Sequence, residues 1–189
     1  MKSNQSNKSK QRARLLSGAF FLSAVLIFAA LVACGEGSDT AIASEGQARN
    51  MEARGKYLVV IGGCNDCHTI GYPESGGKTP ESEWLTGAPV GFRGPWGTTY
   101  PANLRLTVAG IDEENWVTMT RSREALPPMP WPSLNQMDEQ DLRAIYRYIK
   151  SLGPKGVKAP LAVGPDQEPQ TPYILFEPQH MERLQIGNN

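Results

Sequence analysis

Apolar side chains recur at helical spacing in three stretches of the chain, which predicts helices over 45–61, 112–122 and 138–152. The last pattern is the most regular of the three. Acidic residues occupy its first turn, where they suit the positive end of the helix dipole, and Gly153 follows its end. Its apolar positions fall on one stripe, which predicts a helix that packs one face against a core: Leu142, Ile145, Tyr146, Ile149 and Leu152.

Between the helical stretches, glycine and proline residues interrupt any regular spacing of apolar side chains. Residues 69–103 show no regular pattern, which predicts long loops that wrap around something. The segment 126–132 (LPPMPWP) holds four prolines, which forbid a helix and favour an extended path. The C-terminal segment 154–189 is also rich in proline and is either a disordered tail or an extended strap. The apolar run at 173–176 favours docking of that part.

The N-terminus has the pattern of an export signal. Basic residues precede an uncharged apolar stretch over 15–33, and residues 31–34 (LVAC) resemble the bacterial lipobox. That resemblance implies that residues 1–33 are a lipoprotein signal peptide and that Cys34 becomes the acylated N-terminus. The alternative is an uncleaved inner-membrane anchor, because the apolar stretch is long enough to span a bilayer. Both place the body on the periplasmic side of a bacterial cell envelope, and Gly35 after the cysteine favours the outer membrane.

Charge is unevenly distributed along the chain. Because the first 33 residues hold five of the 19 basic residues and none of the 19 acidic ones, the remainder carries a net charge of −5. A mildly acidic body argues against a nucleic-acid-binding protein, which would carry a basic face. The single long apolar run excludes a polytopic membrane protein. Residues 34–47 are small, polar and acidic, which predicts a flexible tether.

Residues 64–68 (CNDCH) form the C-x-x-C-H motif of covalent haem attachment. The thiols of Cys64 and Cys67 can add across the two vinyl groups of one porphyrin, and His68 can then reach the iron from the proximal face. A thioredoxin-type pair would need a βαβ setting, and a zinc site would need two further ligands. We therefore expect one covalent haem c per chain. No cysteine then remains for a disulfide, because Cys34 is expected to carry lipid.

A low-spin electron carrier needs a second strong iron ligand besides His68. The other histidine, His180, lies in the C-terminal segment, so a methionine is the better candidate. Met129 stands between two prolines in the loop that connects two predicted helices, where it can present its thioether from the opposite face. The alternatives are Met119 and Met137, which are expected to pack in or beside the helices.

Together these features resemble class I c-type cytochromes over residues 48–153. The resemblance rests on the helix before the motif, on CNDCH, on the LPPMPW loop and on the LRAIYRYIKSL helix. It implies an all-α fold with three to five helices around one haem and long Gly/Pro-rich loops, preceded by the signal and tether and followed by the extended strap. It also implies that Gly55 lets the first helix approach the last near Tyr146.

More narrowly, the stretch from GPWGTTYPANL to the last helix is similar to cytochrome domains that serve membrane-bound dehydrogenases of alcohols, aldehydes and related substrates. Those proteins often carry several C-x-x-C-H motifs, whereas this chain has one and no dehydrogenase motif. The resemblance therefore implies a single-haem carrier rather than an enzyme. Its expected partners are a dehydrogenase, an oxidase or another cytochrome, and the membrane through the lipid anchor. Side chains of the 91–105 loop are implied to meet the haem propionates, the candidates being Trp96, Tyr100 and Asn103, with Arg93 and Arg105 also available.

Two other classes of function stay open at this point. A haem-based gas or redox sensor, or a peroxidase-like enzyme, needs an open sixth coordination site, which would exist if Met129 were not bound. The chain offers no distal histidine to assist O–O cleavage, which disfavours the enzyme. The third class is a structural haem module in a larger complex.

Overall fold

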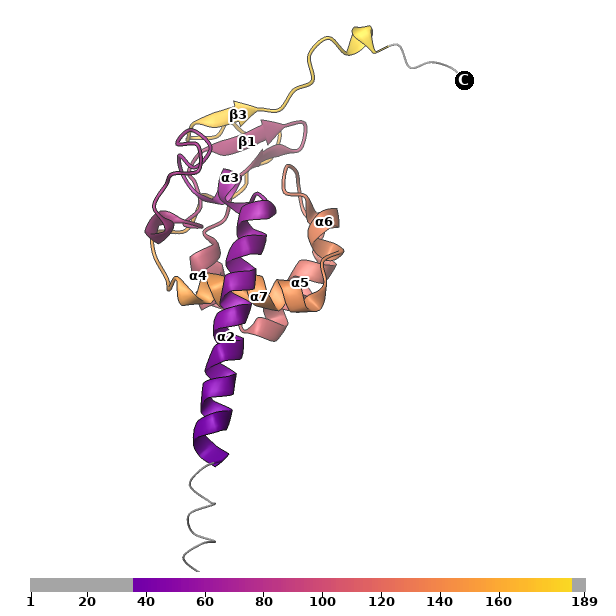
Figure 1. Ribbon diagram of the computed structural model, residues 1–189. Helices are drawn as coiled ribbons and strands as arrows, with labels where there is room; N and C mark the ends of the chain where they lie inside the picture. Colours follow the sequence, from indigo (N-terminus) through magenta and orange to yellow (C-terminus); the bar gives the residue numbers. More distant parts are fainter. Residues whose placement is uncertain (1–35, 185–189) are drawn as a thin grey trace, which may run out of the picture. The chain divides into compact units, whose positions relative to one another are not determined.

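The computed structural model describes residues 36–184, with side chains described from residue 45. The chain divides into two compact units after Ala48, and the second unit contains every element from α3 onward. The predicted signal peptide and Cys34 lie outside the described residues. No helix within 36–184 is long and apolar enough to cross a membrane. The elements in chain order are α2 (Glu36–Ile61), α3 (Cys64–His68), η1 (Glu81–Glu83), β1 (Gly91–Gly94), β2 (Gly97–Thr99), α4 (Leu104–Ala109), α5 (Glu113–Ser122), α6 (Trp131–Asn135), α7 (Glu139–Ser151), β3 (Tyr173–Leu175) and η2 (Met181–Arg183) (Figure 1).

The predicted stripe of α7 lies at the centre of the hydrophobic core. Leu142 and Ile149 are almost completely buried, and they share the core with residues of α2, α4 and α5. Trp116 of α5 donates a hydrogen bond from its indole nitrogen to the Leu142 carbonyl oxygen at 3.0 Å. Asp112 caps α5 by accepting from the Asn115 backbone N–H, as the sequence predicts. The bounds of α5 and α7 confirm both predicted helices to within one residue.

The helix α7 crosses α2 closely (Figure 1), and Gly55 permits this crossing. A Cβ atom at Gly55 would collide with the backbone carbonyl of Ala144 and would press on the Cβ of Tyr148. The expectation of a close approach at Gly55 is therefore confirmed, although the contact lies at Ala144 and Tyr148 rather than at Tyr146. A bidentate ion pair between Arg54 and Asp141, with both N–O distances 2.9 Å, joins the same two helices.

The helix α2 begins earlier than the sequence predicts. It starts at Glu36, so residues 36–47 are helical rather than the expected flexible tether. Alanine, glutamate and glutamine in this stretch are good helix formers, and they extend a helix that residues 48–61 have already nucleated. The predicted end is confirmed, because α2 stops at Ile61 and Gly63 adopts a positive φ of 65°.

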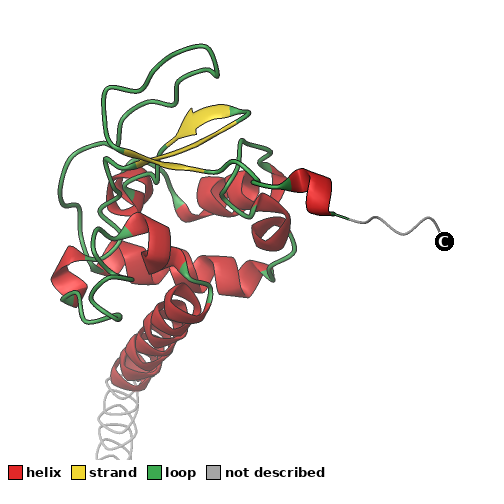
Figure 2. Ribbon diagram, turned by 90° about the horizontal axis from the view of Figure 1, so that it is seen from above, coloured by secondary structure: helices red, strands yellow, loops and turns green. Residues whose placement is uncertain are grey.

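Three short strands depart from the all-α expectation. β1 and β2 form an antiparallel hairpin inside the 69–103 segment, with Phe92 opposite Thr99. β3 pairs in parallel with the other side of β1, with Phe92 opposite Ile174, so the strand order is β2-β1-β3. Figure 2 shows these strands beside the helices, with long loops elsewhere in the same part of the molecule. Strands of three or four residues are too short to display a period, and β3 is remote in sequence from its partner β1.

The C-terminal segment lies along this hairpin, and residues 154–178 are called the strap. Thr98 and Val163 exchange backbone hydrogen bonds of 2.9 and 3.0 Å, and the Phe176 N–H donates to the Arg93 carbonyl at 2.6 Å. The expected docking of 173–176 is therefore confirmed.

The helix α6 begins inside the proline-rich segment that the sequence predicts to be extended throughout. Trp131 starts the helix and Pro132 occupies its first turn, where a missing backbone N–H costs no hydrogen bond. Pro127 and Pro128 form a turn and Met129 lies in a bend, so the prediction of an extended path is also wrong over these residues. Met129 lies in the non-helical part, as the sequence predicts.

Candidate haem-binding site

The helix α3 presents the two cysteines of the motif on one face. A single turn separates Cys64 from Cys67, so their side chains lie one above the other. Both are free thiols and both are partly exposed. Burial raises the pKa of Cys64 to about 11 and also raises that of Cys67, so both thiols are protonated at neutral pH. The pair is thus available as thiols for addition to two vinyl groups.

The ring of His68 is held in one orientation. Its Nδ1 lies 2.7 Å from the Ala102 carbonyl oxygen, and the residue is only 6% exposed. A carbonyl oxygen can only accept, so Nδ1 carries the proton and Nε2 keeps its lone pair. Burial lowers the pKa of His68, which favours the neutral ring. A neutral imidazole whose Nδ1–H is fixed by a backbone carbonyl is the arrangement typical of metal-ligating histidines.

Backbone and side-chain hydrogen bonds fix the motif to the segment that follows it. The Gly87 N–H donates to the His68 carbonyl oxygen at 2.8 Å. The hydroxyl of Thr69 donates to the Asn65 side-chain oxygen at 2.7 Å and accepts from the Leu85 N–H at 2.8 Å. Asn65, Thr69 and Leu85 are all buried. The orientation of α3 is therefore set by the chain itself.

The predicted distal ligand, Met129, lies half-buried in the loop between α5 and α6. The hydroxyl of Thr99 donates to the Pro127 carbonyl oxygen at 2.6 Å, which ties this loop to the end of β2. At its other end, the guanidinium of Arg123 stacks on the ring of Trp131 at 5.0 Å from the centroid. The loop is thus fastened on both sides of the methionine.

The alternative methionines have structural roles. Met51, Met119 and Met137 pack against the hydrophobic core, whereas Met129 is not part of the described core or its border. Met119 also accepts a weak hydrogen bond on its sulfur from Arg123 at 3.7 Å. Met129 therefore differs from these three methionines, because its sulfur is not engaged in core packing. Met181 also lies outside the core, but it is exposed in the C-terminal segment.

Two of the predicted propionate-binding residues make hydrogen bonds within the chain. The side-chain oxygen of Asn103 caps α4 by accepting from the Leu106 N–H, and its two amide hydrogens donate to the carbonyls of Lys155 and Val157. Both side-chain donors of Asn103 are thus used within the chain, and its contact with a propionate stays a prediction. Arg105 donates to three backbone carbonyls, those of Ser82, Leu152 and Gly153.

Two further candidates fasten the strap. Arg93 donates to the Gln167 carbonyl oxygen at 2.8 Å and stacks on the Tyr173 ring. The hydroxyl of Tyr100 shares a hydrogen bond of 2.8 Å with the Thr171 hydroxyl. Tyr100 thus has a structural contact, and its service to the cofactor stays a prediction. The sequence shows polar residues of functional type but does not show that their partners lie about 70 residues further along.

Trp96 remains as a candidate for direct contact with a cofactor. Its indole nitrogen is buried and has no hydrogen-bond partner, a condition that it shares, among the side chains described, with Nδ2 of Asn65. A buried donor without an acceptor costs about 1–3 kcal/mol, so an acceptor is expected. A haem propionate is such an acceptor. Paired thiols, an oriented histidine, a methionine outside the core and this donor together fit haem c.

Other kinds of metal site find no support in the described part of the chain. Within residues 45–184, no group of three or more histidine, cysteine, aspartate or glutamate side chains could hold a metal ion. Sequence reasoning misses one residue of the site, Ala102, because a backbone carbonyl leaves no signature in the sequence.

Comparison with known proteins finds distant relatives that are subunits of dehydrogenases. The chain is 30% identical over 134 residues to the cytochrome c subunit of alcohol dehydrogenase (quinone) from Gluconacetobacter polyoxogenes, and equally to that from Komagataeibacter europaeus. These alignments cover 65% of this chain and 25% of each relative. It is also 27% identical over 120 residues to one of the subunits of nicotinate dehydrogenase from Pseudomonas putida, covering 58% of this chain and 9% of that protein.

These weak similarities support a cytochrome c-like relationship. The chain spans about a quarter of the length of the alcohol dehydrogenase subunits that it matches. No family model matches the chain, and no solved structure matches it.

Proposed function

We propose that the protein is a single-haem c-type cytochrome that carries electrons one at a time between a dehydrogenase and a respiratory acceptor. The observation that carries this proposal is the geometry of α3. Two free thiols share a face, and the neighbouring His68 is held by Ala102 with Nε2 available. The chain contains one such motif. The dehydrogenase partner is proposed because the relatives are subunits of dehydrogenases.

In this proposal each residue has a separate task. Haem iron supplies reversible one-electron chemistry when the group is bound. Cys64 and Cys67 fix the group covalently, so it is not lost on each encounter with a partner. His68 and Met129 would both ligate the iron and would stay bound in both oxidation states, so little rearrangement would accompany electron transfer. A thioether ligand favours the reduced form and raises the reduction potential.

Covalent attachment is tested on the full chain produced with a cytochrome c maturation system. The purified protein is extracted with acidic acetone, and its intact mass is measured. We expect haem colour to stay with the polypeptide and the mass to rise by one haem. The matched variant Cys64→Ala, Cys67→Ala should lose the colour. Haem that leaves the wild-type polypeptide would overturn the proposal.

Carbon monoxide distinguishes a carrier from a sensor or a peroxidase-like enzyme. With His68 and Met129 both bound, the ferrous protein should take up carbon monoxide slowly and incompletely. Rapid, complete binding to the wild type would favour an open sixth site and would replace the electron carrier by the sensor.

We further propose that the protein is tethered to a bacterial membrane by lipid on Cys34 and faces the periplasm. The support is the lipobox-like sequence at 31–34 and the basic start of the chain. Mass spectrometry of the membrane fraction should show that residues 1–33 are lost and that acyl mass is added. Recovery of residues 1–33 still joined to the rest would establish the uncleaved anchor instead.

A further inference from the structure

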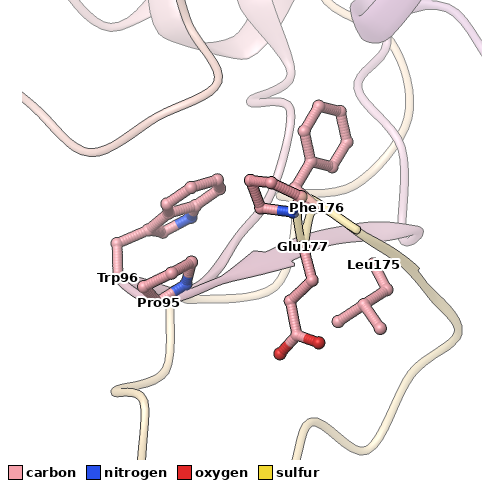
Figure 3. Close-up of a pocket in the computed structure, with 6 residues that line it drawn as sticks. Pro95, Trp96, Leu175, Phe176 and Glu177 are labelled. Atoms are coloured by element: carbon pink, nitrogen blue, oxygen red, sulfur yellow. The ribbon is translucent and has the colours of Figure 1, made fainter. Parts of the chain in front are cut away.

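The loop between β1 and β2 and the end of the strap border an apolar pocket of about 440 Å³. Trp96 stands on the loop side of this pocket, and Phe176 stands on the strap side. Their ring centroids are 6.3 Å apart, and Phe176 also makes an edge-on contact with Phe92 at 5.6 Å. Figure 3 shows the Trp96 and Phe176 side chains on the same side of the sheet, with Leu175 on the other. The pocket is lined by Pro95, Trp96, Leu175, Phe176, Glu177 and Pro178.

The orientation of Trp96 is fixed from two directions. Its ring lies flat on Gly94, where a Cβ atom would come within 2.5 Å of the indole carbons. Phe176 packs against it from the strap. The indole nitrogen is buried in this position without a partner, although the rest of the side chain is only half-buried. These contacts therefore fix the direction of the Trp96 indole N–H, a hydrogen-bond donor that is shielded from water.

The strap is built to keep Phe176 in place. The Phe176 N–H donates to the Arg93 carbonyl oxygen at 2.6 Å, and this bond continues the parallel pairing of β3 with β1. Further back, the strap is fastened by the side chains of Arg93 and Tyr100. The residue Phe176 is 41% exposed, so its burial alone does not explain the many hydrogen bonds that hold the strap.

We propose that Phe176 is a positioning residue for the redox site and that it acts through Trp96. By holding the indole, Phe176 keeps the Nε1–H turned away from water and available to a carboxylate of the bound haem. The inference rests on the proposed function, because that function supplies the carboxylate. A donor to a propionate offsets part of the negative charge near the iron, which favours the reduced state and raises the potential. The strap would thus contribute to the reduction potential without touching the iron.

The test compares the holoprotein with Phe176→Ala and with Ile174→Ala, a matched control on the same strand. Ile174 is 51% exposed and does not line the pocket. The first readout is hydrogen exchange of the indole N–H groups, followed by nitrogen-15 NMR of the ferrous protein. Phe176→Ala should speed exchange at Trp96 by about tenfold, a factor that the loss of one aromatic contact can produce. Trp116, whose indole is bonded to Leu142, should stay slow, and Ile174→Ala should change neither.

The second readout is the midpoint potential in a double-mutant cycle. Phe176→Ala and Trp96→Phe should each lower the potential. If Phe176 acts through Trp96, the double variant should match Trp96→Phe alone. Unchanged exchange at Trp96, or a Phe176→Ala shift that persists in full without the indole, would overturn the inference.

Two precautions keep the outcomes distinct. Haem content is measured first, because a protein without covalent haem overturns the proposed function, whereas a loaded protein with unchanged exchange overturns the strap inference alone. If Phe176→Ala does not fold, Phe176→Leu keeps an apolar side chain at the same place. That variant should show a smaller acceleration in the same direction, and exchange at the wild-type rate would count against the inference.

Discussion

The helical half of the protein and its loop half satisfy their polar groups in different ways. In the helical half, formed by α4, α5 and α7, the buried polar side chains find partners within the chain. Trp116 donates to Leu142, the Thr120 hydroxyl to the Trp116 carbonyl, and the Tyr146 hydroxyl to the Ile111 carbonyl. Among the side chains described, both buried nitrogens without a partner lie outside this half, on Asn65 and Trp96. The buried polar side chains of the helical half therefore need no cofactor to complete their hydrogen bonds.

The loop half concentrates the groups that a cofactor would use. Two free thiols, an oriented histidine and a methionine outside the core all belong to α3 or to the loops. The contrast teaches that packing and function are divided between the two halves. Changes in the helical half should therefore act on stability, and changes in the loop half should act on the strap and the redox centre.

The largest effect is expected at the crossing of α2 and α7. Gly55→Ala would place a methyl group against the Ala144 carbonyl, and a backbone atom cannot move aside as a side chain can. We expect the free energy of unfolding to fall by about 3 kcal/mol or more, measured by denaturant titration.

Gly46→Ala is the matched control, because Gly46 lies in the same helix and a Cβ atom there meets nothing within 4 Å. It should raise stability by about 0.5–1 kcal/mol through helix propensity. Equal behaviour of the two variants would show that the helices do not cross closely at Gly55.

A smaller and more local effect is expected at Gly97, where the hairpin meets the strap. Gly97 has a φ of +99°, and a Cβ atom would collide with the Val163 carbonyl. Gly97→Ala should release the strap and speed amide exchange at Val163 and Thr98, while exchange in α7 stays slow.

The control for backbone strain alone is Gly76→Ala. Gly76 also has a positive φ, of 64°, but open space surrounds it. Its substitution should leave exchange at Val163 unchanged. If exchange in α7 accelerated as much as exchange in the strap, the two halves would not be independent.

Much of the helical half could be predicted from the sequence, because its signals are local. The stripe of α7 and the cap at Asp112 each lie within a few residues of the structure that they specify. CNDCH is equally local as a motif, but the one-turn helix that it forms is seen only in the structure.

The loop half could be predicted only in part, because its contacts are remote in sequence. β3 pairs with β1 across about 80 residues of sequence, and neither strand has an alternation of apolar and polar residues that predicts the pairing. Asn103 and Tyr100 stand out by residue type, but their partners lie in the strap. The carbonyl of Ala102 carries no sequence signal at all. The start of α2 at Glu36 is not predictable, because small polar residues suit both a helix and a tether.

The smallest effect on stability is expected when the pH is lowered. Lys56 donates to the Glu81 carboxylate, and this hydrogen bond, the largest cause, holds the pKa of Glu81 below its usual value. A carboxylate with a lowered pKa adds stability that is present above its ordinary pKa of about 4.3 and is lost as the pH falls through the lower folded value.

Glu81→Gln should therefore reduce stability slightly at pH 7 and should not reduce it at pH 2–3. The measurement is the unfolding midpoint across this pH range. A difference between variant and wild type that grows toward low pH would have the wrong sign for this pair.

The most direct test of the central claim is the near-infrared band that a sulfur-to-iron bond gives to ferric haem. The claim is that the loop half presents Met129 to a haem held by His68. Wild type should show the band, Met129→Ala should lose it and bind carbon monoxide readily when reduced, and Met119→Ala and Met137→Ala should keep it. A band that survives Met129→Ala but vanishes in Met119→Ala or Met137→Ala would contradict the account and move the ligand to a methionine that packs against the core.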